Sequence, residues 1–299
     1  MPVVVFGLLN KYMVKIKLTG GLGNQMFQYV MARAVAIRNN TDLDLDISWF
    51  KKIKGNTSRK YNLDDFNIKG EIIETSLFSK IKSKIYFWEL NKPYSKRKFI
   101  KEEKIFNFNP EILKISGDVY IEGYWQSEKY FKDIEDVIRK DFTLKDKFSD
   151  IGENLKKQIL NCEAVSLHIR RGDYLSNAEA NNFHGLCSLD YYNKAVSIIS
   201  EKVKDPVFFI FSDDIEWVKE NLKINFPMIF IENSFGLKDT EELILMSLCK
   251  HYIIANSSFS WWGAWLGNNK NKLVLSPKKW VNDNNIEVKD LIPNEWILI

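Results

Sequence analysis

The feature that most constrains this 299-residue chain is the alternation of short apolar runs with longer amphipathic stretches. Apolar runs of strand length occupy 14–18, 42–47, 164–169, 207–211, 228–231 and 252–255. The helical spacing of apolar residues predicts helices over 25–38, 190–201 and 240–249. This order is typical of βαβ units, in which helices cover parallel sheets. The chain is therefore predicted to be an α/β protein.

The α/β pattern falls into two blocks. Residues 142–163 separate them and mix charged and polar residues without a strong apolar stripe. A boundary near 145–160 predicts an N-terminal Rossmann-like domain over 14–150 and a C-terminal one over 151–299. Such folds bind ligands where their strands end, so we expect a central cleft between the domains. Residues 1–12 are excluded from this fold because we interpret them as an upstream start or an added sequence.

The charge of the chain excludes a whole-protein nucleic-acid footprint. Lys and Arg number 43 against 39 Asp and Glu, a net charge of only +4. Residues 51–104 are an exception, because 15 basic residues there face 7 acidic ones. Two interpretations of this basic region stay open. It is a solvated Lys-rich surface, or it contacts anionic lipid or an anionic acceptor.

Cysteine usage and hydropathy indicate a cytoplasmic protein. Cys162, Cys187 and Cys249 are odd in number, far apart and outside C-x-x-C spacing, so neither a zinc site nor a disulfide framework is expected. The apolar run in residues 1–9 is too short for a membrane span and no basic region precedes it, so we expect no signal anchor.

A glycine-rich turn, TGGLGNQ at 19–25, lies between the first strand and the first helix. Backbone N–H groups bind phosphate at this position in many α/β proteins. The turn lacks the third glycine of G-x-G-x-x-G, where Met26 stands, and the Lys-Ser/Thr of a P-loop, so dinucleotide and ATP binding are not supported. Tight packing of the first turn explains the glycines equally well.

The segment HIRRGDY at 168–174 places ionisable side chains at the end of a buried strand. The strand alternation predicts that His168 and Arg170 project together while Arg171 points the opposite way. Arg170 is the candidate phosphate clamp, because a guanidinium presents a planar fork of donors and stays charged. For Arg171 the alternative is a buried ion pair with Asp173.

The segment NSSFSWWGAW at 256–265 follows a strand and begins a helix. Ser257 and Ser258 fall in the N-cap region, where an anion also binds. Three hydroxyls exceed what capping needs, and aromatic planes stack on sugars and bases. For Trp262 and Trp265 we expect core packing instead.

Two acidic groups raise the question of a metal. Asp213 and Asp214 end another strand, where Ser212 or Asp213 also suits a helix cap. Asp42, Asp44 and Asp46 share one face of a predicted strand. No His or further acid joins either group at ligand spacing, so no metal is expected.

Taken in order, six segments resemble the bacterial α-1,2-fucosyltransferases of glycosyltransferase family 11, and the resemblance covers most of the chain from residue 14 onward. They are GGLGNQMFQY (20–29), GYWQSEKYF (123–131), HIRRGDY (168–174), HGLCSLDYY (184–192), FSDDIEW (211–217) and LMSLCKHYIIANSSFSWWGAWL (245–266). The resemblance implies a GT-B fold, GDP-β-L-fucose as donor, a terminal β-galactoside as acceptor, inversion at the anomeric carbon, and no metal or other cofactor.

The resemblance also implies roles for single residues. It places the β-phosphate on Arg170, the guanosine near His168, further phosphate contacts on Asn24 and Ser258, and guanine on Glu242, where the family usually has Asp. With their neighbours, the expected donor-binding residues are Gly21, Gly23, Asn24, Gln25, His168, Arg170, Asp213, Glu242, Ser257, Ser258 and Phe259.

Inverting transfer calls for a general base that takes the proton of the acceptor hydroxyl. Arg170 is expected to be catalytic through the leaving phosphate, and the candidate bases are Asp173, Glu179 and His184. We favour Asp173. Its alternative role is to orient Arg170 or to cap the loop.

The sequence therefore predicts a galactoside 2-α-L-fucosyltransferase that works in O-antigen or other surface glycan synthesis. Its predicted partners are GDP-fucose and a glycan acceptor, which is lipid-linked if residues 51–104 hold the enzyme at the inner membrane. Acceptor choice is expected to depend on loops such as 51–67. The alternatives are a GDP-fucose-dependent GT-B transferase with another acceptor or linkage, and a non-catalytic sugar-nucleotide-binding protein.

Overall fold

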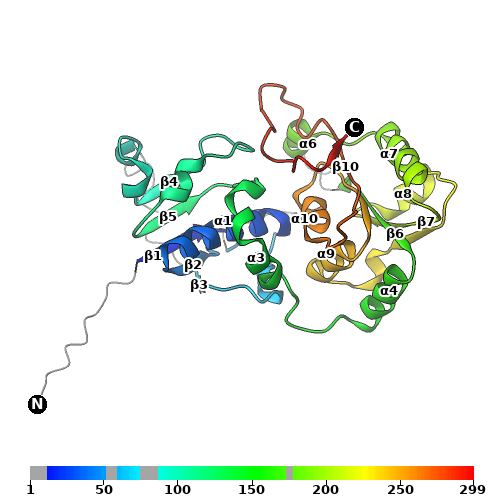
Figure 1. Cartoon of the computed structure of the whole chain (residues 1–299), viewed down its shortest axis with the longest axis horizontal. Coiled ribbons are helices and arrows are strands. Elements are labelled where there is room, and N and C mark those ends of the chain that lie inside the picture. The colour runs from blue at the N-terminus through cyan, green and yellow to red at the C-terminus, as the bar shows by residue number, and fades with distance from the viewer. Residues whose placement is uncertain (1–11, 52–58, 75–86, 173–177) are drawn as a thin grey trace, which may run out of the picture.

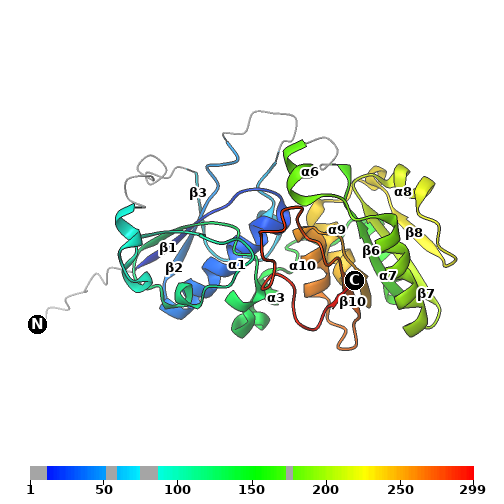
Figure 2. The same cartoon turned by 90° about the horizontal axis from the view of Figure 1, so that it is seen from above.

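A computed structural model describes residues 12–51, 59–74, 87–172 and 178–299 (Figure 1). All but the last residue of the predicted upstream segment 1–12 lie outside these ranges. Figures 1 and 2 show the two halves of the chain side by side, each built around its own sheet. The α/β class predicted from the alternating pattern is confirmed.

Five described strands form the first sheet, in the order β3-β2-β1-β5-β4 with all pairs parallel. Its central strand β1 (Met13–Lys17) buries Val14 and Ile16 completely. The helix α1 (Leu22–Asn39) follows it, and the other strands are β2 (Asp42–Asp46), β3 (Glu71–Ile73), β4 (Phe99–Lys101) and β5 (Val119–Glu122). The predicted elements over 14–18, 25–38 and 42–47 are confirmed.

Six described strands form the second sheet, in the order β11-β10-β9-β6-β7-β8 and again all parallel. They are β6 (Glu163–Ile169), β7 (Pro206–Ser212), β8 (Met228–Ile231), β9 (His251–Ile253), β10 (Val274–Ser276) and β11 (Ile297–Leu298). The strand β7 lies on one side of β6, and the chain later returns to place β9 on the other side of β6. Ligands of parallel sheets bind at such a change of direction, beyond the carboxyl ends of the strands.

The helices of the second half are α6 (Ala178–His184), α7 (Leu189–Lys202), α8 (Ile215–Asn221), α9 (Asp239–Ser247) and α10 (Ser258–Leu266). Short 3-10 turns lie at Leu63–Asp65, Tyr94–Lys96, Pro110–Lys114, Glu128–Tyr130, Lys132–Ile134 and Asn233–Phe235. The predicted helices over 190–201 and 240–249 correspond to α7 and α9.

The stretch predicted to connect the two blocks is more ordered than expected. It begins directly after α3 (Glu135–Asp141) and contains all of α4 (Asp150–Leu160). Ser149 caps α4 by accepting a hydrogen bond from the Gly152 N–H at 3.1 Å. Ile151, Leu155 and Ile159 follow one another every four residues along α4, and Leu155 and Ile159 are buried, so the expectation of no strong apolar stripe here was wrong. The strands of the two sheets fall on either side of this stretch, while the domain limits 14–150 and 151–299 stay a prediction.

The two halves share a core where α1 packs on α10 (Figures 1 and 2). The Phe27 ring lies 4.5 Å from that of Trp261 and 4.9 Å from that of Trp262, between ring centroids. Trp262 and Trp265 are buried, as predicted. The core packing therefore fixes the start of one helix relative to the start of the other.

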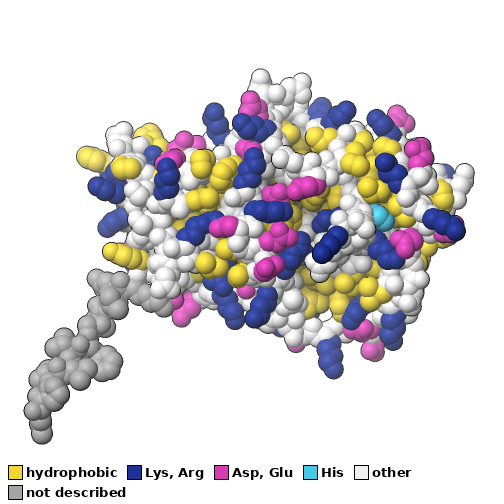
Figure 3. Space-filling view, in the orientation of Figure 1, with side chains coloured by type: hydrophobic (Ala, Val, Ile, Leu, Met, Phe, Trp, Pro, Cys, Tyr) yellow, Lys and Arg dark blue, Asp and Glu magenta, His cyan; other side chains and the backbone are white. Residues whose placement is uncertain are grey.

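The surface carries both signs of charge, interspersed on the face drawn in Figure 3. Lys and Arg lie beside hydrophobic side chains at the end that carries β4 (Figure 3). Among the described helices, none combines the length and the apolarity needed to cross a membrane.

Candidate active site

A cavity of about 670 Å³ lies where the two halves meet. Ligand pockets have volumes of this order. Its walls come from the turn between β1 and α1, from residues that follow β5, β6, β7 and β9, and from the first turns of α9 and α10. The cleft predicted between the two α/β blocks is therefore present.

The glycine-rich turn brings α1 against α10. A Cβ on Gly23 would lie 2.5 Å from the backbone carbon of Ser258, so only glycine allows this approach. Trp262 donates from its ring nitrogen to the carbonyl of Gly23 at 3.1 Å. Gly21 and Gly23 also line the cavity. The glycines therefore do both things that the sequence suggested: they allow tight packing against α10 and they line the ligand cavity.

Asn24 connects the halves inside the cavity. Its side-chain oxygen accepts hydrogen bonds from Gln126 Nε2 and from Ser258 Oγ, both at 2.8 Å. These contacts fix the amide, so that its NH₂ group is what Asn24 offers as a donor. Because the Ser258 hydroxyl donates its hydrogen to Asn24, α10 would bind an anion through the backbone N–H groups of its first turn.

The first turn of α10 faces the cavity. Ser257 is the N-cap and accepts a hydrogen bond from the Phe259 N–H at 3.3 Å. Ser257, Ser258 and Phe259 all line the cavity. The N-terminal end of a helix attracts anions through its unpaired N–H groups and its dipole.

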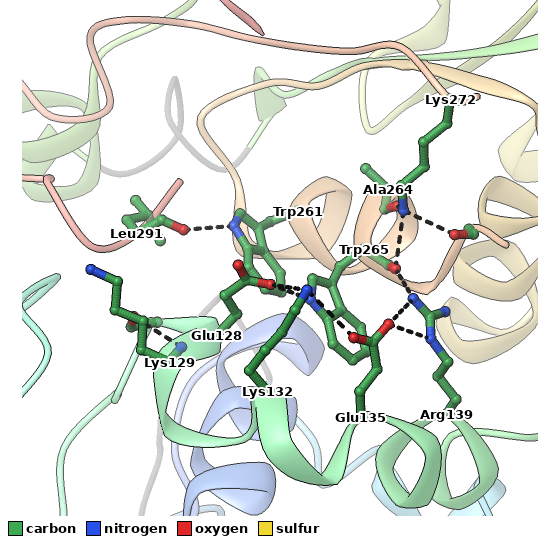
Figure 4. Close-up of polar contacts among 12 residues, drawn as sticks. Glu128, Lys129, Lys132, Glu135, Arg139, Trp261, Ala264, Trp265, Lys272 and Leu291 are labelled. Carbon is green, nitrogen blue, oxygen red and sulfur yellow. Dashed lines mark hydrogen bonds and ion pairs between the residues drawn. The ribbon is translucent and has the colours of Figure 1, made fainter. Parts of the chain in front are cut away.

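The opposite end of α10 is held by cations and by the first half (Figure 4). Arg139 donates to the carbonyls of Trp265 and Leu266 at 2.8 and 2.7 Å, and Lys272 donates to Ala264 at 2.7 Å. Trp265 donates to Glu128 at 3.0 Å. Positive charges at the C-terminal end suit the helix dipole. Burial and, to a smaller extent, the neighbouring Arg139 lower the pKa of Lys272 to about 8.

Arg170 reaches the cavity from the end of β6. Its Nε lies 3.2 Å from Asp213 Oδ2, and Arg170 lines the cavity with a group that suits phosphate oxygens. Burial raises the pKa of Asp213, but Arg170 and the Arg171 N–H, which donates to it at 2.8 Å, lower it more, so that this pKa lies below its ordinary value. Asp213 is therefore an ionised carboxylate and holds Arg170 through an ion pair.

Arg171 points away from the cavity, as the strand alternation predicted. The expected partner Asp173 lies outside the described residues. Arg171 instead pairs with Asp214 at 3.2 Å and stacks on the Trp217 ring at 3.6 Å. Among the described residues, Asp214 and Trp217 are thus its partners, because α8 follows β7 directly and brings both alongside.

His168 lines the cavity and is buried, with 3% of its surface exposed. Burial and the charge of Arg170 lower its pKa to about 3, so the imidazole is neutral. Within the described ranges its Nδ1 has no hydrogen-bond partner. The ring centroid lies 5.7 Å from that of Phe259. A buried polar atom of this kind is typical of a site completed by a ligand.

Glu242 faces the same cavity from the first turn of α9. Burial, together with the nearby Asp239 and Asp213, raises its pKa to about 7, while Arg170 acts in the opposite direction. Perturbed carboxyl groups of this kind are common in ligand sites. Glu242 can accept hydrogen bonds as a carboxylate just above neutral pH.

Of the three candidate bases, the structure describes the side chain of one. His184 lines the cavity, and burial lowers its pKa to about 4. Asp173 lies outside the described residues, and of Glu179 only the place in α6 is described. His184 is neutral at ordinary pH, and its low pKa makes it a weak base.

Gln25 is a correction to the predicted donor-binding set. It is fully buried and lies outside the cavity lining. Its amide donates to the Gly20 carbonyl and to the Lys60 carbonyl, and accepts from the Asn62 N–H. All its polar atoms are thus used to hold the chain in place.

The acidic residues of β2 have partners within the protein. Asp44 pairs with Lys15 at 2.8 Å, and Asp46 accepts from the Tyr120 hydroxyl at 2.6 Å. Within the described ranges, no group of three His, Cys, Asp or Glu residues is placed to hold a metal ion.

The sequence motifs missed several residues of the cavity wall. Gln126 and Tyr124 lie within GYWQSEKYF, and Ser212 and Asn256 lie within other quoted segments, but none was expected at the site. The remaining lining residues are Leu22, Arg59, Ile105, Phe106, Phe183, Asp239 and Trp280. Leu22 belongs to the glycine-rich motif, whereas the others lie outside the quoted segments, and only folding brings them together.

Two solved structures share this architecture. The fucosyltransferase NodZ from Bradyrhizobium is 12% identical and superposes with a TM-score of 0.51, covering 85% of this chain and 92% of that one. A selenomethionine form of the same enzyme gives 0.51 at 11% identity, covering 85% and 91%. The GT-B fold expected from the motifs is confirmed.

The relatives with known activities are transferases. An α-1,2-colitosyltransferase of Escherichia coli is 35% identical, over 96% of this chain and 98% of its own length. The O-antigen biosynthesis glycosyltransferase WbnK of Escherichia coli is 34% identical, over 94% and 98%. A galactoside α-(1,2)-fucosyltransferase 1 of Rattus norvegicus is 27% identical over 55% of this chain and 44% of its own. The profile of glycosyl transferase family 11 matches residues 8–299, and the chain belongs to that family.

Proposed function

We propose that this glycosyltransferase transfers L-fucose from GDP-β-L-fucose to the O2 hydroxyl of a terminal β-galactoside, with inversion, in O-antigen or other surface glycan synthesis. The observation that carries the proposal is the cavity in which Arg170, the α10 N-terminus and Glu242 meet. A guanidinium and helix N–H groups suit a diphosphate, and a carboxylate suits the donor edge of guanine.

The chemistry follows from these groups. As the sugar–phosphate bond breaks, negative charge develops on the diphosphate, and donors that are already oriented stabilise it without reorganisation. Asp213 orients the guanidinium of Arg170 by the ion pair at 3.2 Å. Neutral His168 offers one donor and one acceptor to the nucleoside. Its buried, unpaired Nδ1 supports that role.

The general base is assigned to Asp173, with Glu179 and His184 as the alternatives. Asp173→Asn should lower turnover about 100-fold with little change in GDP affinity. Turnover equal to that of the parent enzyme would remove Asp173 from the reaction.

A second donor is favoured by the relative that is named a colitosyltransferase, which matches nearly the whole chain. Colitose is L-fucose without its 3-hydroxyl, so both donors offer the same diphosphate and guanine. The test is to supply GDP-fucose or GDP-colitose with a β-galactoside and to compare kcat/KM for transfer. A preference for GDP-fucose supports the proposal, and a preference for GDP-colitose replaces it with the second candidate.

A further inference from the structure

Arg59 lines the cavity from the first half of the chain, in a segment where the sequence indicated only an acceptor loop. A Cβ on Gly21 would lie 3.3 Å from Arg59 Nη1, so the guanidinium lies over the glycine-rich turn. Gly21 is the N-cap of α1. Arg59 thus adds a positive charge beside helix N–H groups that already favour an anion.

Gln25 holds the segment that carries Arg59. Its Nε2 donates to the Gly20 carbonyl at 3.0 Å and to the Lys60 carbonyl at 2.8 Å, while its Oε1 accepts from the Asn62 N–H at 3.0 Å. One buried amide therefore joins the glycine-rich turn to the residues that follow Arg59. Buried hydrogen bonds of this kind define a single backbone position.

The same segment is fixed to the second half. Asn62 donates to Asp239 at 3.1 Å. Asp65 accepts from Lys238 at 2.6 Å and from the Thr240 hydroxyl at 2.8 Å. Asp239 and Thr240 begin α9, the helix that carries Glu242. The backbone beside Arg59 is thus held between the glycine-rich turn and the helix expected to bind guanine.

The charges around the cavity indicate the ligand of Arg59. A terminal β-galactoside carries no charge, whereas the diphosphate of the donor carries at least two negative charges. We propose that Arg59 binds this diphosphate together with Arg170, and that Gln25 is the residue that positions it. The inference rests on the proposed GDP-sugar donor.

The test is calorimetric titration of the full chain with GDP and with guanosine. Arg59→Gln should weaken GDP binding about 10-fold to 100-fold, since a hydrogen bond to a charged group contributes about 1.5–3 kcal/mol. Guanosine affinity should change less than about twofold. Arg59→Lys should fall between, because it keeps the charge but loses the planar fork. Lys60→Gln is the matched control: it removes the same charge from an exposed side chain one residue away and should bind GDP like the parent.

Gln25 is tested by a double-mutant cycle. Gln25→Leu should weaken GDP binding in the parent protein and add little loss in the Arg59→Gln background. If Gln25→Leu does not fold, Gln25→Glu takes its place in the same cycle, because it keeps the length of the side chain but lacks the Nε2 donor to the Gly20 and Lys60 carbonyls. The inference is overturned if Arg59→Gln binds GDP like the parent, if it loses guanosine and GDP equally, or if the losses in the cycle are additive. A parent protein that binds neither ligand would instead overturn the proposed donor.

Discussion

Arg170 and Arg171 are adjacent arginines with different surroundings. Arg170 faces the cavity and pairs with Asp213, whereas Arg171 pairs with Asp214 and stacks on Trp217. Because a strand alternates its faces, one residue of separation decides which guanidinium can meet a ligand.

This difference predicts unequal effects of the same substitution. Arg170→Lys should lower turnover about 100-fold, because lysine keeps the charge but not the oriented fork of donors. Arg171→Lys is the matched control and should stay within about threefold of the parent. Steady-state rates with GDP-fucose and a β-galactoside measure both. Equal losses in the two variants would contradict the assignment of Arg170 to the phosphate.

Glu242 predicts a pH dependence of nucleoside binding. Its pKa is raised to about 7, so the group is protonated below neutral pH and becomes a carboxylate acceptor above it. Guanosine affinity should therefore rise as the pH increases from 6 to 8 and then level off. His168 and His184, with pKa values of about 3 and 4, stay neutral throughout. Guanosine is the suitable ligand because it has no phosphate that titrates in this range.

The control for this dependence is Glu242→Gln, which cannot ionise. Titrations at several pH values should show weaker binding and a flat profile for the variant. If guanosine affinity of Glu242→Gln depended on pH as steeply as that of the parent, a group other than Glu242 would be responsible for the dependence.

At the scale of elements, the approach of α1 to α10 depends on Gly23. Gly23→Ala would place a methyl group 2.5 Å from the Ser258 backbone, which neither helix can avoid without moving. We expect a loss of about 1–3 kcal/mol in unfolding free energy, the usual effect of overpacking. Gly21→Ala is the control, since its methyl would meet only the flexible end of Arg59 at 3.3 Å. Thermal unfolding with equal melting temperatures for both variants would contradict this account.

Most of the longer elements could be predicted from the sequence, and so could the short strands β8 and β9, but several other short strands could not. The strands β1, β6 and β7 and the helices α1, α7 and α9 have enough residues for a period to show. The strands β3, β4 and β10 have three residues each, too few for a period to show. Their structure depends on neighbours that only the folded chain supplies.

The same limit applies to the site. Arg170, Asn24 and Ser258 belong to motifs at the ends of long elements, and all three line the cavity as their positions predicted. Arg59 and Asp239 lie far apart in sequence and carry no motif. Gln25 belongs to a motif, but only the structure shows that its side chain holds backbone groups.

At the scale of the whole molecule, the basic region 51–104 leads to a prediction about lipid. Part of it lies outside the described residues, but Phe87 and Trp88 are described and are 69% and 77% exposed. Exposed aromatic side chains beside Lys and Arg suit an anionic bilayer surface. The protein should sediment with anionic vesicles and be released as salt increases.

Trp88→Ser should weaken this vesicle binding several-fold. Leu160→Ser is the control, because Leu160 is also exposed, at 55%, but lies on α4 in the other half. Binding to neutral and anionic vesicles alike, or none at low salt, would contradict the lipid interpretation and leave the solvated surface.

The central claim concerns the reaction, and it is tested most directly by the linkage of the product. The protein is incubated with GDP-fucose and lactose in the presence of EDTA, and the product is analysed by NMR. The account predicts fucose on O2 of the galactose, formed without a divalent metal ion and with inversion. Fucose at another hydroxyl, or transfer that requires added metal, would contradict it.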